Sequence, residues 1–386
     1  MLNKAKKIQS EMVAWRRDIH MHPELGFEEK RTSALIAETM EGLGYRVRTG
    51  VGKTGVVAEI GSGKPVVAIR ADMDALPIKE ANQVPYKSKN DGVMHACGHD
   101  AHVAIAMGTA KLLAAENFPG TVRFLFQPAE ETDDGEFSGA PRMIEDGAIA
   151  DVDNVLALHV DAAGNTGEIE IATEYASAGV DTFYAKIIGK GGHGSTPHKV
   201  VDPIFISGHV ILALHGIVSR QLRPYDPAVI SIGSIQGGQT DNVIPEEVNL
   251  LGTIRFLIPE VQEKIHAEIK NALEITRNLG GDYELKIEVG YPPMHNHPEI
   301  VDLIKLVAGD LLGEDKIIPP EPGMGAEDFG YFLEKAPGAM FMLGCKIEGD
   351  ERRHHDPRFD VDEDCFPIGA AIISETALRI LGQSDK

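Results

Sequence analysis

The feature that most constrains this chain is the stretch Met94-His95-Ala96-Cys97-Gly98-His99-Asp100-Ala101-His102, which a helical pattern follows over residues 103–113. Six of its nine residues are Cys, His, Asp or Met. Cys97 and His99 lie on either side of a glycine, so both side chains can turn toward one centre as thiolate and imidazole ligands of a zinc-like metal. The alternative is a helix cap with buried polar side chains, and ligands elsewhere in the chain decide between the two.

Polar side chains also follow the strands predicted around this stretch. Apolar runs predict strands over residues 56–60, 65–70, 121–126 and 154–158, and helical patterns cover 8–20 and 32–43. Asp72, Glu131 and His159 each fall at the carboxyl end of a predicted strand. Alternating strands and helices predict an α/β fold with a largely parallel sheet, in which ligands collect at that edge. The metal-site interpretation is therefore favoured over the helix cap.

A second unit is predicted to begin near residue 179. Its strands and helices follow in the order βαββαβ, over residues 181–188, 203–222, 228–235, 247–257, 259–279 and 283–291. This order is that of a ferredoxin-like sandwich. The chain then returns to an α/β pattern, with helices over 299–312 and 367–381 and a strand over 339–343. The predicted domains are thus 1–178 and 293–386 for the α/β unit, with 179–292 inserted.

Charge and cysteine content exclude several functions. The chain has 37 Lys and Arg against 59 Asp and Glu, and its net charge of −22 argues against nucleic acid or an anionic membrane as partner. Three cysteines make no disulfide framework, and we find neither a signal core nor an apolar run long enough to span a bilayer. These observations predict a cytoplasmic protein. Arg16, Arg17, Glu28 and Glu29 are interpreted as solvent-facing charges.

The candidate ligands are Cys97, His99, Glu131, His159 and one of His354 and His355. Five ligands exceed what one four-coordinate structural zinc takes from a protein. They predict two metals about 3.5–4 Å apart with one shared ligand, a clamp that activates water and polarises a carbonyl. Glu130 is the candidate general base, because adjacent side chains point in different directions and Glu131 can bind metal beside it.

Four motifs resemble the signature of the M20 metallopeptidase family. They are Arg70-Ala71-Asp72-Met73-Asp74-Ala75-Leu76-Pro77, Met94-His95-Ala96-Cys97-Gly98-His99-Asp100, Gln127-Pro128-Ala129-Glu130-Glu131 and His355-Asp356-Pro357-Arg358-Phe359-Asp360. The resemblance runs from Arg16 to Arg379 and is to the N-acyl-amino-acid amidohydrolases: hippurate hydrolases, auxin-conjugate hydrolases and N-acetyl-diaminopimelate deacetylases. It implies a dinuclear catalytic domain with an inserted ferredoxin-like lid that mediates dimerisation.

The resemblance also implies roles for single residues. It assigns the metal ligands to Cys97, His99, Glu131, His159 and His355, with Cys97 as the bridging ligand. Among the other residues, Glu130 matches the general base. Asp74 matches an acid that orients a ligand, and Asp72 is left without a ligand role. His355 is preferred over His354 because it directly precedes Asp356-Pro357-Arg358-Phe359.

Three further positions in the inserted domain match the family. His193, in Gly191-Gly192-His193-Gly194-Ser195, matches the lid histidine that steadies an oxyanion. Asn242 and Arg255 match substrate-binding positions, and Arg255 suits a free carboxylate, although a surface salt bridge is its alternative. Gly325-Ala326-Glu327-Asp328-Phe329 departs by one residue from the family's Gly-Ser-Glu-Asp-Phe, a change that bears on acyl preference.

The predicted function is hydrolysis of N-acyl-L-amino acids to a carboxylate and a free amino acid, with two divalent ions (Zn²⁺, Mn²⁺, Co²⁺ or Ni²⁺). Glu130 would take a proton from the activated water and return it to the leaving amine, and His193 would stabilise the oxyanion. The alternatives are a di- or tripeptidase of the same fold, a non-catalytic metal-binding protein, and a cysteine hydrolase that uses Cys97. The expected assembly is a homodimer through the lid, with a tetramer as alternative.

Overall fold

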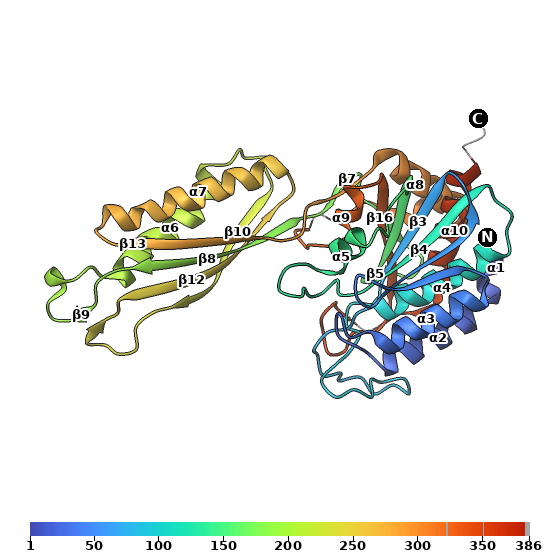
Figure 1. The fold of residues 1–386 in the computed structure, drawn as a ribbon, viewed down its shortest axis with the longest axis horizontal. Coiled ribbons are helices and arrows are strands. Elements are labelled where there is room, and N and C mark those ends of the chain that lie inside the picture. Colours follow the sequence, from blue (N-terminus) through green and yellow to red (C-terminus); the bar gives the residue numbers. More distant parts are fainter. Residues whose placement is uncertain (322, 350, 383–386) are drawn as a thin grey trace. The chain divides into compact units, whose positions relative to one another are not determined.

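The computed structural model describes residues 1–321, 323–349 and 351–382, and it divides into two compact units (Figure 1). Unit 1 takes in the described residues of 1–176, 295–321 and 331–382. Unit 2 takes in residues 177–294 and 323–330. The sequence assigned all of 293–386 to the α/β domain, whereas 323–330 group with unit 2, where the Ala178 N–H donates to the Gly325 carbonyl at 2.7 Å.

Unit 1 is built on an eight-stranded mixed sheet in the order β1-β2-β4-β3-β5-β16-β6-β15. The strands are β1 (Arg46–Val51), β2 (Gly55–Ser62), β3 (Val66–Asp72), β4 (Gly120–Gln127), β5 (Asn154–Asn165), β6 (Ile169–Glu170), β15 (Ile317–Ile318) and β16 (Gly338–Lys346). The central strands β4, β3, β5 and β16 are parallel, as predicted. The other pairings of the sheet include antiparallel ones: β1 pairs with β2 across a short turn, β2 pairs with β4, and β6 pairs with β16.

The helices of unit 1 cover this sheet. They are α1 (Leu2–Lys7), α2 (Gln9–Met21), α3 (Lys30–Gly42), α4 (His99–Ala114), α5 (Gly139–Glu145), α8 (Pro298–Leu312) and α10 (Phe366–Gly382), and α9 (Gly330–Leu333) lies at the unit boundary. α4 is almost fully buried and contacts α2, α10 and β3. All seven residues of β3 are buried as well, as expected of a central parallel strand covered on both faces.

Unit 2 is a ferredoxin-like sandwich, which confirms the predicted βαββαβ order. Its antiparallel sheet has the order β10-β12-β8-β13, built from β8 (Gly179–Ile188), β10 (Ala228–Gln236), β12 (Glu247–Phe256) and β13 (Asp282–Val289). Alternate residues of β8 (Phe183, Ala185 and Ile187) join the core under α6 (Pro203–Arg220) and α7 (Pro259–Asn278). Short strands complete the chain: β7 (Glu174–Ser177), β9 (Gly192–His193), β11 (Val243–Ile244) and β14 (Met294–Asn296).

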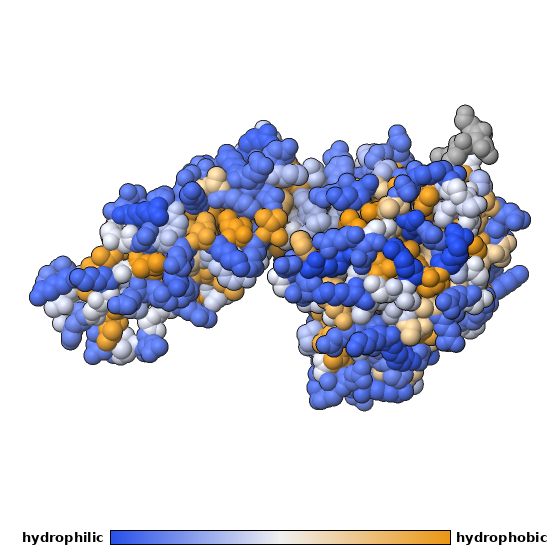
Figure 2. Space-filling model, in the orientation of Figure 1, coloured by the Kyte–Doolittle hydropathy of each residue, from blue (hydrophilic) through white to orange (hydrophobic). Residues whose placement is uncertain are grey.

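Among the described residues, two helices are long and apolar enough to cross a membrane by length and composition alone. One is the region of α10, whose apolar window is 72% buried, so it is a core helix. The other is α6, whose window is 33% buried. Phe205 and Leu212 on α6 are 60% and 74% exposed, and apolar groups are visible among the mostly hydrophilic surface in Figure 2.

Candidate metal centre

The predicted ligands of unit 1 gather at the carboxyl edge of the parallel strands. β3 ends at Asp72, which pairs in register with Gln127 at the end of β4, shortly before Glu130 and Glu131. His159 lies on β5, which continues to Asn165 and does not end where the sequence predicted. The loop that enters α4 supplies Cys97 and His99. The fold thus brings side chains from four segments to one edge.

The five predicted ligands fall into two trios that share Cys97. The ligand atoms of Cys97, His99 and His159 lie within 4.8 Å of one another, and so do those of Cys97, Glu131 and His355. The Cys97 Sγ is 3.6 Å from His159 Nε2, and His355 Nε2 is 3.0 Å from Glu131 Oε1. Two trios with a common thiol suit a pair of metals with one bridging ligand.

Hydrogen bonds leave the Nε2 atom of both histidines in the first trio available for a metal. His99 Nδ1 donates to the carbonyl of Asp74 at 3.0 Å and to its Oδ1 at 3.1 Å, and His159 Nδ1 donates to the Val160 carbonyl at 2.8 Å. His99 Nε2 is buried and makes no hydrogen bond with any described residue. A buried imidazole Nε2 that makes no hydrogen bond, on a ring whose Nδ1 does, is typical of a metal ligand.

The electrostatics of the first trio also fit a cation. Burial raises the pKa of the Cys97 thiol well above its usual value. Burial would lower the pKa of His99, but the Asp72 charge and the Asp74 hydrogen bond raise it well above its ordinary range. Burial, together with His102 and His354, lowers the pKa of His159 well below 6.5, so this ring is neutral. A divalent ion would replace the protons on Cys97 and His99.

The structure separates the two adjacent histidines, His354 and His355. His355 has a positive φ of 61°, its N–H donates to the Ala96 carbonyl at 2.8 Å, and its ring reaches Glu131. His354 Nδ1 lies 3.8 Å from Cys97 Sγ, while its Nε2 accepts the Ala162 N–H at 3.4 Å. His354 therefore contacts the thiol of Cys97 but belongs to neither trio.

Glu130 lies beside the first trio, with its Oε2 3.9 Å from His99 Nε2. The preceding residue, Ala129, has a positive φ of 46°, and its N–H donates to Glu29 Oε1 at 2.8 Å. Asp74 accepts the Glu131 N–H at 3.0 Å while it also holds His99. Asp74 therefore supports the segment that carries both glutamates as well as one imidazole.

Two charges that the sequence analysis placed in solvent are fully buried, and for them that interpretation was wrong. Glu29 binds the Ala129 N–H as described above. Arg16 pairs with Asp100 and with Asp360, each at 2.8 Å, so it anchors the loop that carries Cys97 and His99. The signal available in the sequence was the i, i+4 spacing of Arg16 and His20, which face Asp100 together.

The three predicted residues of unit 2 lie at two different places within it. His193 on β9 pairs with Val243 on β11, and the Gly194 N–H donates to the Asn242 carbonyl at 2.8 Å. The N–H of Ser195 donates to His193 Nδ1 at 3.1 Å, so Nε2 carries the hydrogen and can donate it. Arg255 lies near the far end of β12, and no described carboxylate pairs with it.

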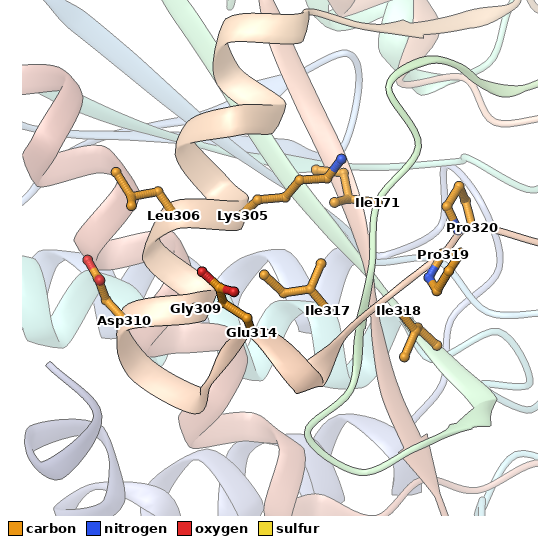
Figure 3. Close-up of a pocket in the computed structure, with 10 residues that line it drawn as sticks. All are labelled: Ile171, Lys305, Leu306, Gly309, Asp310, Glu314, Ile317, Ile318, Pro319 and Pro320. Carbon is orange, nitrogen blue, oxygen red and sulfur yellow. The ribbon is translucent and has the colours of Figure 1, made fainter.

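Unit 1 also contains a pocket of about 570 Å³ (Figure 3). Its lining comes mainly from α8 and β15 and includes Lys305, Asp310 and Ile317. None of the predicted site residues lines it. The chemistry predicted from the sequence therefore belongs to the two trios and not to this pocket.

Comparisons with known proteins show the family of this chain. Residues 68–379 match the model of a family described as Peptidase family M20/M25/M40. Thermostable carboxypeptidase 2 of Saccharolobus solfataricus is 42% identical over 98% of this chain and 97% of its own. N-acetyl-L-cysteine deacetylase of Bacillus subtilis is 37% identical over 98% and 90%. The crystal structure of Bacillus subtilis YXEP, a dinuclear metal binding peptidase from the M20 family, superposes with a TM-score of 0.85 at 33% identity, over 98% of this chain and 99% of that one.

The α/β fold, the paired ligand trios and these relatives together define a metal-dependent hydrolase that acts on amide bonds. The chain belongs to the M20 peptidase family, which confirms the resemblance seen in its motifs.

Proposed function

We propose that this enzyme hydrolyses N-acyl-L-amino acids, with an acetyl, benzoyl or similar acyl group, to a carboxylate and a free amino acid. The observation that carries the proposal is the pair of ligand trios that share Cys97, with Glu130 beside them. The relative named as a deacetylase of N-acetyl-L-cysteine supports it, because that substrate is an N-acyl amino acid.

In this proposal Cys97, His99 and His159 hold one ion, and Cys97, Glu131 and His355 hold the other. Bound divalent ions, whether Zn²⁺, Mn²⁺, Co²⁺ or Ni²⁺, would polarise the scissile carbonyl and increase the acidity of water. The hydrogen bonds from His99 to Asp74 and from His159 to Val160 keep both rings oriented with Nε2 toward Cys97.

Glu130 carries out the proton transfers in this proposal. Its carboxylate takes a proton from the attacking water and returns it to the leaving amine, which makes a free amino acid from the amide nitrogen. His193 donates its Nε2 hydrogen to the developing oxyanion, and its contact with Ser195 fixes the tautomer that this requires. Asn242 and Arg255 bind the substrate, with the guanidinium on the free carboxylate.

A second candidate is hydrolysis of peptides from the carboxyl end. The relative named as a carboxypeptidase, 42% identical to this chain, favours it. In both candidate reactions the amino acid that is released carries a free carboxylate, so Arg255 could bind that carboxylate in either one. They differ in the group on the other side of the amide, which is a simple acyl group or a peptide.

The test is release of free amino acid from matched N-acetyl, N-benzoyl and dipeptide substrates by chelated protein, then by protein reconstituted with each metal. We expect the metals to restore turnover of the acyl substrates. We expect Glu130→Gln to lower kcat by about 10²–10⁴-fold, because the variant loses proton transfer. Metal content measured on the same samples shows whether that variant still binds its ions.

Glu136→Gln is the matched control, because Glu136 lies close in sequence but is exposed and pairs only with Arg142 among the described residues. It should keep full turnover. Preference for dipeptides would replace the first candidate with the second. A fully metallated protein that turns over none of these substrates would contradict both.

We also propose roles for the two units and a location for the enzyme. Unit 1 would serve as the catalytic domain, and unit 2 as a lid and dimerisation domain. Free cysteines support a reducing compartment such as the cytoplasm, since Cys345 and Cys365 are buried and unbridged.

A further inference from the structure

His102 is a buried histidine with no role in the chemistry described so far. It lies in the first turn of α4, three residues after His99, and its side chain is 1% exposed. Its Nδ1 is 2.6 Å from Asp72 Oδ1, and its Nε2 accepts the Val160 N–H at 2.9 Å. A backbone N–H can only donate, so Nε2 is unprotonated and Nδ1 carries the hydrogen that Asp72 accepts.

These hydrogen bonds exclude His102 as a metal ligand. The ligand atoms of Asp72, His99 and His102 lie within 4.8 Å of one another, so residue types alone would admit a third trio. However, the Val160 N–H occupies Nε2 of His102. Both oxygens of Asp72 are also engaged, Oδ1 with His102 and Oδ2 with Arg70 at 2.5 Å. A metal at this trio would break buried hydrogen bonds of charged groups.

One imidazole therefore connects the three elements that arrange the first trio. Through Val160 it holds β5 next to His159, and through Asp72 it holds the end of β3. Its ring stacks on His99 with centroids 5.5 Å apart and meets the ring of His159 at 4.6 Å. Among the described residues, His102 makes no hydrogen bond, ion pair or ring contact with Glu131 or His355 of the second trio.

We propose that His102 is a positioning residue, which fixes His99 and His159 relative to each other and so sets the affinity of the first trio for its ion. The inference rests on the proposed metal pair. Loss of a group that orients metal ligands typically lowers metal affinity by about 10- to 100-fold. Removal of His102 therefore lowers the affinity of the first trio for its ion by this factor and leaves the affinity of the second trio unchanged.

Two conservative variants separate the two hydrogen bonds. His102→Asn keeps an amide N–H near the position of Nδ1 and loses the acceptor for Val160. His102→Gln keeps a carbonyl oxygen near the position of Nε2 and loses the donor to Asp72. Calorimetric titration of metal-free protein with Co²⁺, with the cobalt–thiolate absorption of Cys97 followed in parallel, counts the ions and measures each affinity.

We expect two ions in the wild type, and in each variant one ion at wild-type affinity and one weakened by about 10- to 100-fold. Thr109→Val, a buried isosteric change further along α4, is the matched control and should bind like the wild type. Two ions at wild-type affinity in both variants would overturn the role of His102. A wild type that binds no ion would instead overturn the proposed metal pair, and this inference with it.

A measurement on the wild type keeps the test valid if the variants do not fold. Nitrogen NMR of ¹⁵N-histidine-labelled protein reports the tautomer of each ring. We expect His102 to remain the Nδ1–H tautomer before and after metal is added, while the Nε2 signals of His99 and His159 move. A metal-dependent shift of His102 Nε2 to a ligated value would show that it is a ligand and overturn the inference.

Discussion

At the scale of single residues, a buried carboxylate holds the backbone that presents Glu130 and Glu131. Ala129 has a φ of 46°, a conformation that costs a residue other than glycine about 1–2 kcal/mol. Glu29 holds it there by accepting the Ala129 N–H at 2.8 Å, and it also accepts the Thr54 hydroxyl at 2.5 Å. Burial raises the pKa of Glu29 to about 7, so the charged form is costly near neutral pH.

This shift predicts a dependence of stability on pH. The pKa of Glu29 is higher in the folded state than its ordinary value of 4.5, so its contribution to stability is complete below pH 4.5 and is lost as the pH rises through about 7. Between pH 5 and pH 8.5 the wild type should lose about 2–3 kcal/mol of unfolding free energy relative to Glu29→Gln, which cannot ionise.

The measurement is urea unfolding of both metal-free proteins across this pH range. Because the other titrating groups are common to the two proteins, their effects cancel in the difference. Parallel curves for the wild type and Glu29→Gln would show that Glu29 keeps an ordinary pKa in the folded protein.

Residue types near the N-terminus did not reveal these roles. Arg16 and Glu29 occur in charged helical sequence, where a solvent-facing position is the usual outcome. Their partners Asp100 and Ala129 are 84 and 100 residues away, so only the fold brings them together. The ligands were predictable because Cys and His in a short glycine-containing loop are chemically specific. His102 and its partners, in contrast, form a pattern only in three dimensions.

At the scale of elements, one glycine sets the entry of the metal loop into α4. Gly98 is the N-cap of α4 with a φ of 97°, a region that other residues rarely adopt. A Cβ added there would lie 2.3 Å from the Val160 Cγ2, and Val160 is itself held by His102. Gly98→Ala should therefore destabilise the metal-free protein by about 2–5 kcal/mol, from backbone strain and overpacking together.

Thermal unfolding of the metal-free protein tests this prediction. Gly42→Ala is the matched control, because Gly42 lies in the last turn of α3 with nothing within 4 Å of the added Cβ. That change should be neutral or stabilise by roughly 0.5–1 kcal/mol. If Gly98→Ala had the same melting temperature as Gly42→Ala, the loop would move away from Val160 without a cost in stability.

Strand prediction succeeded where burial is greatest. The runs at 65–70 and 121–126 became β3 and β4, because continuous β-branched and aromatic sequence is typical of strands covered on both faces. β1 was missed, since Arg46–Val51 is a largely exposed edge strand without apolar alternation. The two-residue strands β6 and β15 are too short to leave any periodic signal.

At the scale of the whole molecule, the surface of unit 2 supports the proposed homodimer. Phe205, His209 and Leu212 recur at helical spacing on the outer face of α6, and Phe205 and Leu212 are largely exposed. β10 is an edge strand of the same unit and exposes Val229 and Ile235. An apolar helix face beside an open strand edge suits a second copy of itself, and in the proposed homodimer that copy would cover both features across a two-fold axis.

The double variant Phe205→Glu, Leu212→Glu should therefore be monomeric, because it places charges on both sides of a self-complementary interface in a chain that already carries a charge of −22. Light scattering after size exclusion should give the wild type twice the chain mass of 41.7 kDa and the variant a single chain mass.

Leu306→Glu is the matched control, since Leu306 is an exposed leucine on α8 of unit 1, and this variant should remain dimeric. A wild type that is monomeric at micromolar concentration, or a double variant that keeps the wild-type mass, would place any self-association elsewhere on the surface. A wild type of four chain masses that falls to two in the double variant would mean that a second interface joins the dimers.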